Sequence, residues 1–165
     1  ETVQSLIDRI VSRGGMVKNL HGQKNLYYQV NATYYSALGE SDEKMLLARA
    51  IQMFMPGKPQ VWYLDLFAGK NDHEAVRRAG ESGHKEINRT NLSTDQIAED
   101  LKKDVVQKQL ALIRMRNTHK AFSEGAEVAI SGGESSLQIR WEYNSAFATL
   151  NVNFESGTYT IVKSR

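Results

Sequence analysis

The sequence contains no cysteine and only two prolines among its 165 residues. Without cysteine, a disulfide scaffold and thiolate chemistry are excluded. The chain also lacks an excess of charge of either sign, because it has 21 basic and 19 acidic side chains. This balance favours neither a nucleic acid nor an anionic membrane as partner. No apolar run approaches the length of a membrane-spanning helix. We therefore expect a globular, cytoplasmic protein.

The first part of the chain has the apolar spacing of helices. Helices are expected over residues 1–13, 30–38, 41–55, 73–78 and 93–118. Gly14 and Gly15 stop the first helix, and Ser93 with Gln96 forms a capping box at the start of the last one. The polar residues 16–29 are expected to form a loop.

An aromatic-rich apolar run occupies the middle of the chain. Both prolines, Pro56 and Pro59, come just before it. Residues 61–67 are nearly all apolar, which is typical of a strand buried on both faces in a parallel sheet. Asp65, inside this run, is expected to make a structural hydrogen bond to a neighbouring strand because a buried carboxylate needs a partner. A contact that holds an active-site side chain is the alternative. The sequence then turns abruptly into polar side chains at Lys70.

In the tail of the chain, apolar and polar residues alternate with a period of two. Strands are expected over residues 128–131, 137–143, 148–154 and 159–162. Such alternation is typical of an antiparallel sheet with one buried face and one wet face. The boundary is placed near residue 122, which divides the chain into residues 1–122 and 123–165.

Two loop side chains are suited to hold a polar ligand. Gln29 follows Tyr27 and Tyr28, and an amide beside tyrosine hydroxyls suits a sugar or a phosphate. Arg89 could contact hydroxyls or phosphate oxygens in a bidentate manner. From the residue types alone, tyrosines at the rim of a core and a surface salt bridge remain the alternatives.

Other candidate chemistry in the sequence is weaker. No second histidine lies at metal-ligand spacing from His21 or His84, so no metal site is predicted. Asp72 and Glu74 invite comparison with a catalytic carboxylate pair, but nothing fixes their separation on a loop. We therefore expect no catalytic role for this pair.

Three segments resemble the sucrose phosphorylase branch of the α-amylase superfamily. Tyr28–Gly39 is similar to the active-site loop of that family and the helix after it, Pro56–Asp72 to its last barrel strand, and Glu86–Arg89 to a loop motif ending in asparagine and arginine. The three segments occur in the family's order between residues 28 and 89. Family members are roughly three times as long, so the chain resembles their C-terminal third.

The resemblance implies a fold and an activity. The fold class is α/β plus β: residues 1–122 would form the last β/α segments of a TIM barrel, and residues 123–165 a small antiparallel β domain. The activity would be that of a retaining α-glucoside phosphorylase, which transfers a glucosyl group to phosphate and yields α-glucose 1-phosphate. Phosphate is the co-substrate, and no metal or organic cofactor is needed.

The resemblance also assigns site residues. Tyr28 and Gln29 match the family's substrate-contacting pair, and Asn88 and Arg89 match the glucose-binding motif; Glu86 stands where better-known members carry aspartate. The nucleophile and the acid/base residue would lie upstream of Glu1, so the chain alone should be inactive. Open barrel segments would expose apolar surface, so we expect self-association.

Alternatives remain open for the donor substrate and for the class of protein. The loops around Asn19 and His84 favour glucosylglycerate as the donor, with sucrose as the other candidate. A hydrolase of the same superfamily differs only in the choice of water over phosphate. A noncatalytic carbohydrate-binding module would use Trp141 and Tyr143 as a sugar platform, although their inward alternation favours a place in the core.

Overall fold

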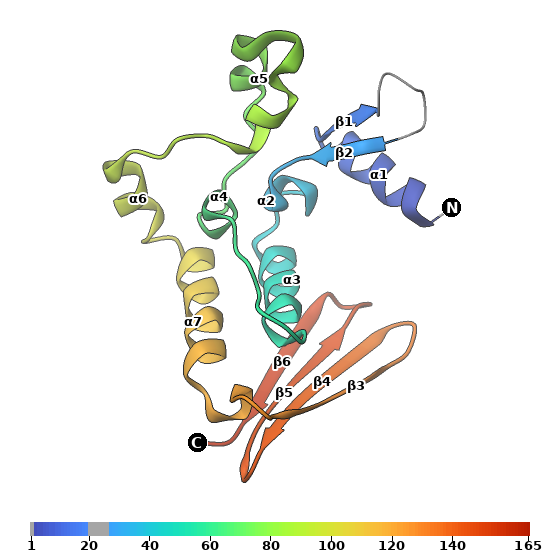
Figure 1. Cartoon of the computed structure of the whole chain (residues 1–165), viewed down its shortest axis with the longest axis vertical. Helices are drawn as coiled ribbons and strands as arrows, with labels where there is room; N and C mark the ends of the chain where they lie inside the picture. Colours follow the sequence, from blue (N-terminus) through green and yellow to red (C-terminus); the bar gives the residue numbers. More distant parts are fainter. Residues whose placement is uncertain (1, 20–26) are drawn as a thin grey trace. The chain divides into compact units, whose positions relative to one another are not determined.

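The computed structural model of the chain describes residues 2–19 and 27–165 (Figure 1). The chain folds into two compact units. The first contains residues 1–42 and 61–106, and the second contains residues 43–60 and 107–165. No helix within the described ranges is long and apolar enough to cross a lipid bilayer.

The first unit consists of short helices and a two-stranded hairpin. Its elements are α1 (Thr2–Ser12), β1 (Met16–Asn19), β2 (Tyr27–Asn31), α2 (Tyr34–Ala37), α4 (Tyr63–Leu66), α5 (His73–Ala79), the 3-10 helix η2 (Gly80–Asn88) and α6 (Thr94–Asp100). The predicted helices at the start of the chain and near residue 73 are confirmed. Gly14, with φ of 83°, follows α1 as expected of a helix stop.

The loop predicted over residues 16–29 is wrong. β1 and β2 pair antiparallel, with Met16 opposite Asn31 and Lys18 opposite Gln29. The two strands were missed because both faces of the hairpin mix apolar and polar residues. Val17 and Val30 are exposed, whereas Gln29 and Asn31 are partly buried.

The strand predicted over residues 61–67 is also wrong. Trp62 is extended, with φ of −70° and ψ of 139°, and the next four residues form the single helical turn α4. Within α4 only Leu64 is buried. Apolar composition indicates burial but does not by itself separate a strand from a short helix. Six of the seven residues 61–67 are apolar, and the structure places a single helical turn among them.

The chain leaves α4 through a tight turn at Ala68 and Gly69. Ala68 has φ of 51°, which non-glycine residues rarely adopt. The Gly69 N–H donates to the carbonyl of Leu64 at 2.9 Å. A Cβ at Gly69 would lie 2.3 Å from Leu64 Cδ1, so this close approach requires glycine.

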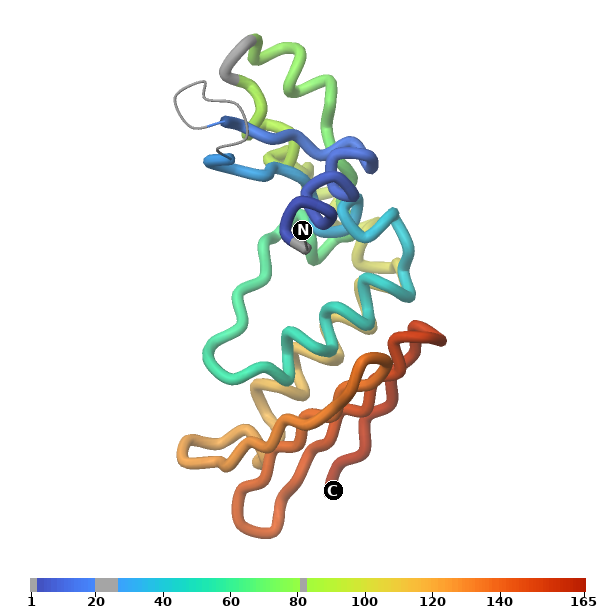
Figure 2. Tube along the Cα trace, turned by 90° about the vertical axis from the view of Figure 1, so that its right-hand side faces the viewer, coloured from blue at the N-terminus to red at the C-terminus, as the bar shows by residue number. Residues whose placement is uncertain are grey.

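The second unit packs helices against a four-stranded sheet. Its elements are α3 (Asp42–Phe54), α7 (Asp104–Thr118), the 3-10 helix η3 (Lys120–Phe122), β3 (Glu127–Gly132), β4 (Ser136–Tyr143), β5 (Ala146–Asn153) and β6 (Thr158–Lys163). The strand order β3-β4-β5-β6 is an antiparallel meander, and Figure 2 shows its strands side by side. All four predicted tail strands are confirmed. The domain boundary near residue 122 stays a prediction.

The helix predicted over residues 93–118 is split in two. Ser93 caps α6 by accepting from the Gln96 N–H at 3.2 Å, as the capping box predicted. α6 then ends at Asp100 and α7 begins at Asp104. The break spans residues 101–103, and the Lys103 ammonium lies 2.7 Å from the carboxylate of Asp100.

Trp141 belongs to the core of the second unit. Its side chain is 8% exposed, and its indole N–H donates to the carbonyl of Phe54 at 2.6 Å. The Arg116 guanidinium lies 4.5 Å from the Trp141 ring and 4.7 Å from the Phe122 ring, an arrangement that attracts the cation to both π faces. Burial lowers the pKa of Arg116. A sugar platform on Trp141 is therefore not supported.

Replacing Trp141 with phenylalanine should destabilise the second unit. The substitution leaves the carbonyl of Phe54 without its donor and removes buried volume, so we expect a loss of about 2 kcal/mol or more in the free energy of unfolding. Urea denaturation followed by circular dichroism measures it. Trp62→Phe is the matched control, because Trp62 is 49% exposed and water can replace its hydrogen bond. Equal losses in both variants would contradict the assignment.

Candidate functional site

A cavity of about 480 Å³ lies beside η2 in the first unit. Its polar lining comes from Asp72, Arg78, Glu86, Arg89, Thr90 and Asn91. Two of the predicted site residues, Glu86 and Arg89, therefore come together here. Asn88, Tyr28 and Gln29 are not among the residues that line this cavity.

Arg89 and Glu86 form an ion pair at the cavity. The guanidinium nitrogen lies 3.5 Å from the carboxylate, and the side chains are 52% and 41% exposed. An ion pair in such a solvated position contributes about 0–1 kcal/mol. The guanidinium can therefore exchange Glu86 for the oxygen atoms of a ligand at little cost.

The backbone on both sides of Arg89 is held by the aromatic run. Trp62 donates its indole N–H to the carbonyl of Asn88 at 2.9 Å. Tyr63 donates its hydroxyl to the carbonyl of Thr90 at 2.8 Å. The residues that were predicted as a buried strand thus use their polar tips to fix the residues before and after Arg89.

Asp72 is one of the residues that line the cavity. Its carboxylate caps α5 by accepting from the Ala75 N–H at 2.8 Å and also accepts from the Thr90 hydroxyl at 3.1 Å. These bonds, the one from Ala75 first, lower the pKa of Asp72. Glu74 points to Arg77 and Arg78 at 3.7 and 3.6 Å. Asp72 and Glu74 are therefore committed to structural contacts.

Asn88 has a structural contact of its own. Its side-chain amide donates to the carbonyl of Ala32 at 3.3 Å, at the end of the hairpin. This bond ties the end of η2 to the segment that follows β2. A direct contact between Asn88 and a ligand stays a prediction.

Tyr28 and Gln29 lie on opposite faces of β2, because neighbouring residues of a strand alternate. The Tyr28 ring is 57% exposed. Gln29 faces the other way, and its buried Oε1 has no hydrogen-bond partner among the described residues. The structure therefore separates this predicted pair, and their role in binding stays a prediction.

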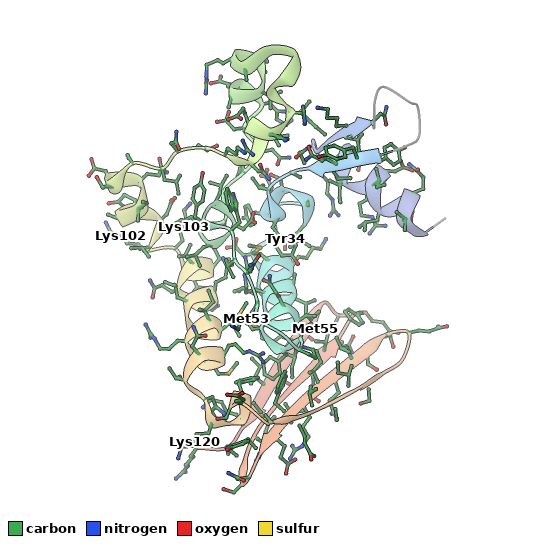
Figure 3. The ribbon with its side chains drawn as sticks, viewed as in Figure 1. Tyr34, Met53, Met55, Lys102, Lys103 and Lys120 are labelled. Carbon is green, nitrogen blue, oxygen red and sulfur yellow. The ribbon has the colours of Figure 1, made fainter. Side chains whose placement is uncertain are left out.

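One side chain of α4 and one after it position the start of α2, where Tyr34 is labelled in Figure 3. Asp65 accepts from the Tyr34 N–H at 2.7 Å. Asn71 accepts from the Thr33 N–H at 2.7 Å. Asp65 was expected to make a structural hydrogen bond, and this is confirmed, although its partner is a helix start and not a strand.

His84 is a buried polar residue whose environment the sequence did not reveal. It is 9% exposed, and its Nε2 has no hydrogen-bond partner in the described part of the chain. Burial, together with the nearby charges of Lys18 and Lys85, lowers the pKa of His84. Its polar sequence neighbours had indicated an open loop.

Comparison with known proteins gives a consistent result. No protein-family model matches the chain. Sucrose 6(F)-phosphate phosphorylase of Ilumatobacter coccineus is 52% identical over 97% of the chain. This chain is related to the sucrose phosphorylases. Sucrose phosphorylase of Agrobacterium vitis is 44% identical over 83% of the chain and 28% of its own length.

The fold agrees with the sequence relationship. The crystal structure of sucrose 6F-phosphate phosphorylase from Thermoanaerobacter thermosaccharolyticum matches with a TM-score of 0.90 at 37% identity over 98% of the chain. The resemblance stated for three segments is thereby confirmed over almost the whole sequence. The fold class, an α/β portion followed by a small antiparallel sheet, is confirmed with it.

The relationship concerns the C-terminal part of these enzymes. The chain spans 31% of the Ilumatobacter relative and 32% of the solved structure. Glucosylglycerate phosphorylase of Spirochaeta thermophila is more distant, at 26% identity over 74% of the chain and 23% of its own length. The order of sequence identities therefore does not support the predicted preference for the glucosylglycerate phosphorylases.

The stabilising effect of Asp72 should depend on pH. Its pKa in the folded chain is lowered from the ordinary 3.8, so the stabilisation is present above pH 3.8 and is lost as the pH falls through the lower folded value. We expect Asp72→Ala to cost about 1 kcal/mol at neutral pH, with the difference from the unmodified chain vanishing in acid. Denaturation curves at both pH values measure this. Asp72→Asn, which retains a capping oxygen, should lose less, and a pH-independent loss would contradict the role of the carboxylate.

Proposed function

We propose that this chain supplies part of the substrate-binding surface of a retaining α-glucoside phosphorylase. The observation that carries this proposal is 52% identity to a sucrose 6(F)-phosphate phosphorylase over 97% of the chain. The cavity at Arg89 and Glu86 supports it, because a charged and hydroxyl-lined pocket suits a sugar and an anion. The nucleophile and the acid/base residue would come from the remainder of the enzyme.

Arg89 would position the glucosyl group or the attacking phosphate. Its guanidinium offers several donors in one plane, which suits vicinal hydroxyls or two phosphate oxygens. The fixed carbonyls of Asn88 and Thr90 hold the backbone of Arg89 in place. Preorganised donors of this kind stabilise charge that develops in a transition state.

Tyr28 and Gln29 would act on the hairpin side of the site. The exposed Tyr28 ring can cover an apolar sugar face. The Gln29 amide oxygen, which has no partner among the described residues, can accept from a sugar hydroxyl. Asn88 would support the hairpin side through its hydrogen bond to Ala32. Glu86 would pair with Arg89 when no ligand is bound.

The reaction would be a double displacement. A carboxylate attacks the anomeric carbon while an acid protonates the leaving group, and phosphate then takes the glucosyl group with overall retention. Phosphate is the only co-substrate required, and no cofactor enters this scheme. Among donors, sucrose and its 6F-phosphate are favoured over glucosylglycerate by the order of sequence identity. We further propose a cytoplasmic enzyme that self-associates.

Replacing Arg89 tests the site. In the enzyme that carries this chain, Arg89→Ala should lower kcat/KM for phosphorolysis by about 100-fold or more, because the positioned donors are lost. Initial rates of α-glucose 1-phosphate release measure the effect.

Arg77→Ala is the matched control for this test. Arg77 also pairs with a glutamate three residues away, at 3.7 Å, yet it does not line the cavity. We expect its kcat/KM to stay within about twofold of the unmodified enzyme. Equal effects of the two substitutions would refute the role of Arg89.

A further inference from the structure

One short segment of the first unit, residues 62–71, bonds to the backbone in two places. Two of its side chains donate to carbonyl groups beside Arg89. Two others accept from N–H groups at the start of α2. None of the four is among the described residues that line the cavity at Arg89. The segment therefore fixes the path of the chain around the site without belonging to the cavity wall.

The two bonds near Arg89 hold carbonyl groups on both sides of it. The Trp62 indole N–H donates to the carbonyl of Asn88 at 2.9 Å. The Tyr63 hydroxyl donates to the carbonyl of Thr90 at 2.8 Å. The two aromatic rings lie against each other, with centroids 4.9 Å apart. These bonds therefore restrict the backbone from which the Arg89 side chain projects.

The side chain of Arg89 contributes little to its own placement. Its guanidinium lies 3.5 Å from the Glu86 carboxylate, and both groups are in contact with solvent, where an ion pair is weak. A misplacement of a reacting or binding group by about 1 Å can cost roughly 100-fold in rate. The placement of the guanidinium thus depends on how firmly the backbone of Arg89 is held.

The segment that carries Tyr63 is itself anchored. Asp65 accepts from the Tyr34 N–H at 2.7 Å. Asn71 accepts from the Thr33 N–H, also at 2.7 Å. Both bonds end on main-chain groups at the start of α2, so the Tyr63 hydroxyl is presented from a fixed support.

The helical conformation of α4 allows one turn to bond in two directions. Successive residues of an α-helix are rotated by about 100°, so Tyr63 and Asp65 leave the turn about 200° apart. One reaches Thr90 and the other reaches the start of α2. In a strand, two residues at this spacing lie on the same face. The single helical turn is therefore what lets this segment join the two places.

We propose that Tyr63 is a positioning residue for phosphorolysis and that it acts through Arg89. Its hydroxyl holds the carbonyl of Thr90 and thereby keeps the Arg89 guanidinium aligned with the substrate. Trp62 supports the same alignment from the other side, at Asn88. The inference rests on the proposed function, because it takes from it the role of Arg89 as a ligand-binding residue.

The direct test is a double-substitution cycle in the enzyme that carries this chain. Tyr63→Phe removes only the hydroxyl, and it should lower kcat/KM for phosphorolysis by about tenfold. In the Arg89→Ala background the same substitution should change kcat/KM by less than about twofold, because the group that Tyr63 positions is already absent. Initial rates of α-glucose 1-phosphate release measure all four enzymes.

The cycle separates the inference from the proposed function. A loss in Tyr63→Phe that recurs in full in the Arg89→Ala background would show that Tyr63 acts independently of Arg89, and it overturns the inference alone. A loss of less than twofold in Tyr63→Phe overturns the inference in the same way. If Arg89→Ala leaves kcat/KM unchanged, the proposed role of the cavity falls together with the inference.

Stability measurements separate positioning from a general loss of structure. Tyr63 is 38% exposed, so water can donate to the Thr90 carbonyl in Tyr63→Phe and the urea midpoint should stay close to that of the unmodified enzyme. A water molecule satisfies the carbonyl but does not hold it in one position. Tyr143→Phe, on β4 of the second unit, is the control tyrosine and should stay within about twofold in kcat/KM.

Trp62→Phe provides a second measurement if Tyr63→Phe lowers stability. It removes the bond to the other carbonyl beside Arg89, and Trp62 is 49% exposed. We expect a loss of about fivefold in kcat/KM that disappears in the Arg89→Ala background. A loss that is equal in both backgrounds would overturn the proposal.

Discussion

The first unit depends on polar side chains that bond to backbone groups, because regular secondary structure is short there. Asp72 caps α5 and holds Thr90, while its own N–H donates to the carbonyl of Ile87 at 2.9 Å. One aspartate thereby joins the start of α5 to the end of η2. This connection also positions the residues that line the cavity, because Arg89 directly precedes Thr90 in the chain.

Two kinds of electrostatic environment lie a few residues apart in the same loop. Arg89 and Glu86 compensate each other in solvent, where exchange of partners is inexpensive. His84 is buried beside positive charge, where an uncompensated polar group costs more. The Arg89–Glu86 pair can therefore exchange partners at a lower cost in free energy than the groups around His84.

The strands of the tail were predictable from sequence because apolar and polar residues alternate there with the same period of two as buried and exposed positions. Ile139 and Trp141 are buried in the core, whereas Gln138 and Glu142 are exposed. The hairpin β1–β2 was not predictable by the same rule, since its covered face carries Gln29 and Asn31. The α4 turn was missed for a different reason, because an apolar run does not by itself separate a strand from a short helix. The helical conformation of α4 places Asp65 against the N–H of Tyr34.

The site was only partly accessible from sequence. Glu86 and Arg89 were identified by resemblance, and the structure brings them together at one cavity. The hydrogen bonds from Trp62 and Tyr63 to neighbouring carbonyls had no sequence signal, because they depend on residues that are more than twenty positions apart. Asn88 was identified as a ligand contact, whereas its visible role is to hold Ala32.

The turn at Ala68 and Gly69 limits how this surface can diversify. Ala68 has a positive φ and Gly69 lies against Leu64, so both positions tolerate few replacements. A substitution at either position would change the direction in which the chain leaves α4. Residues 84–86 on η2 have no positive φ. Their side chains can therefore be replaced without the backbone strain that restricts residues 68 and 69.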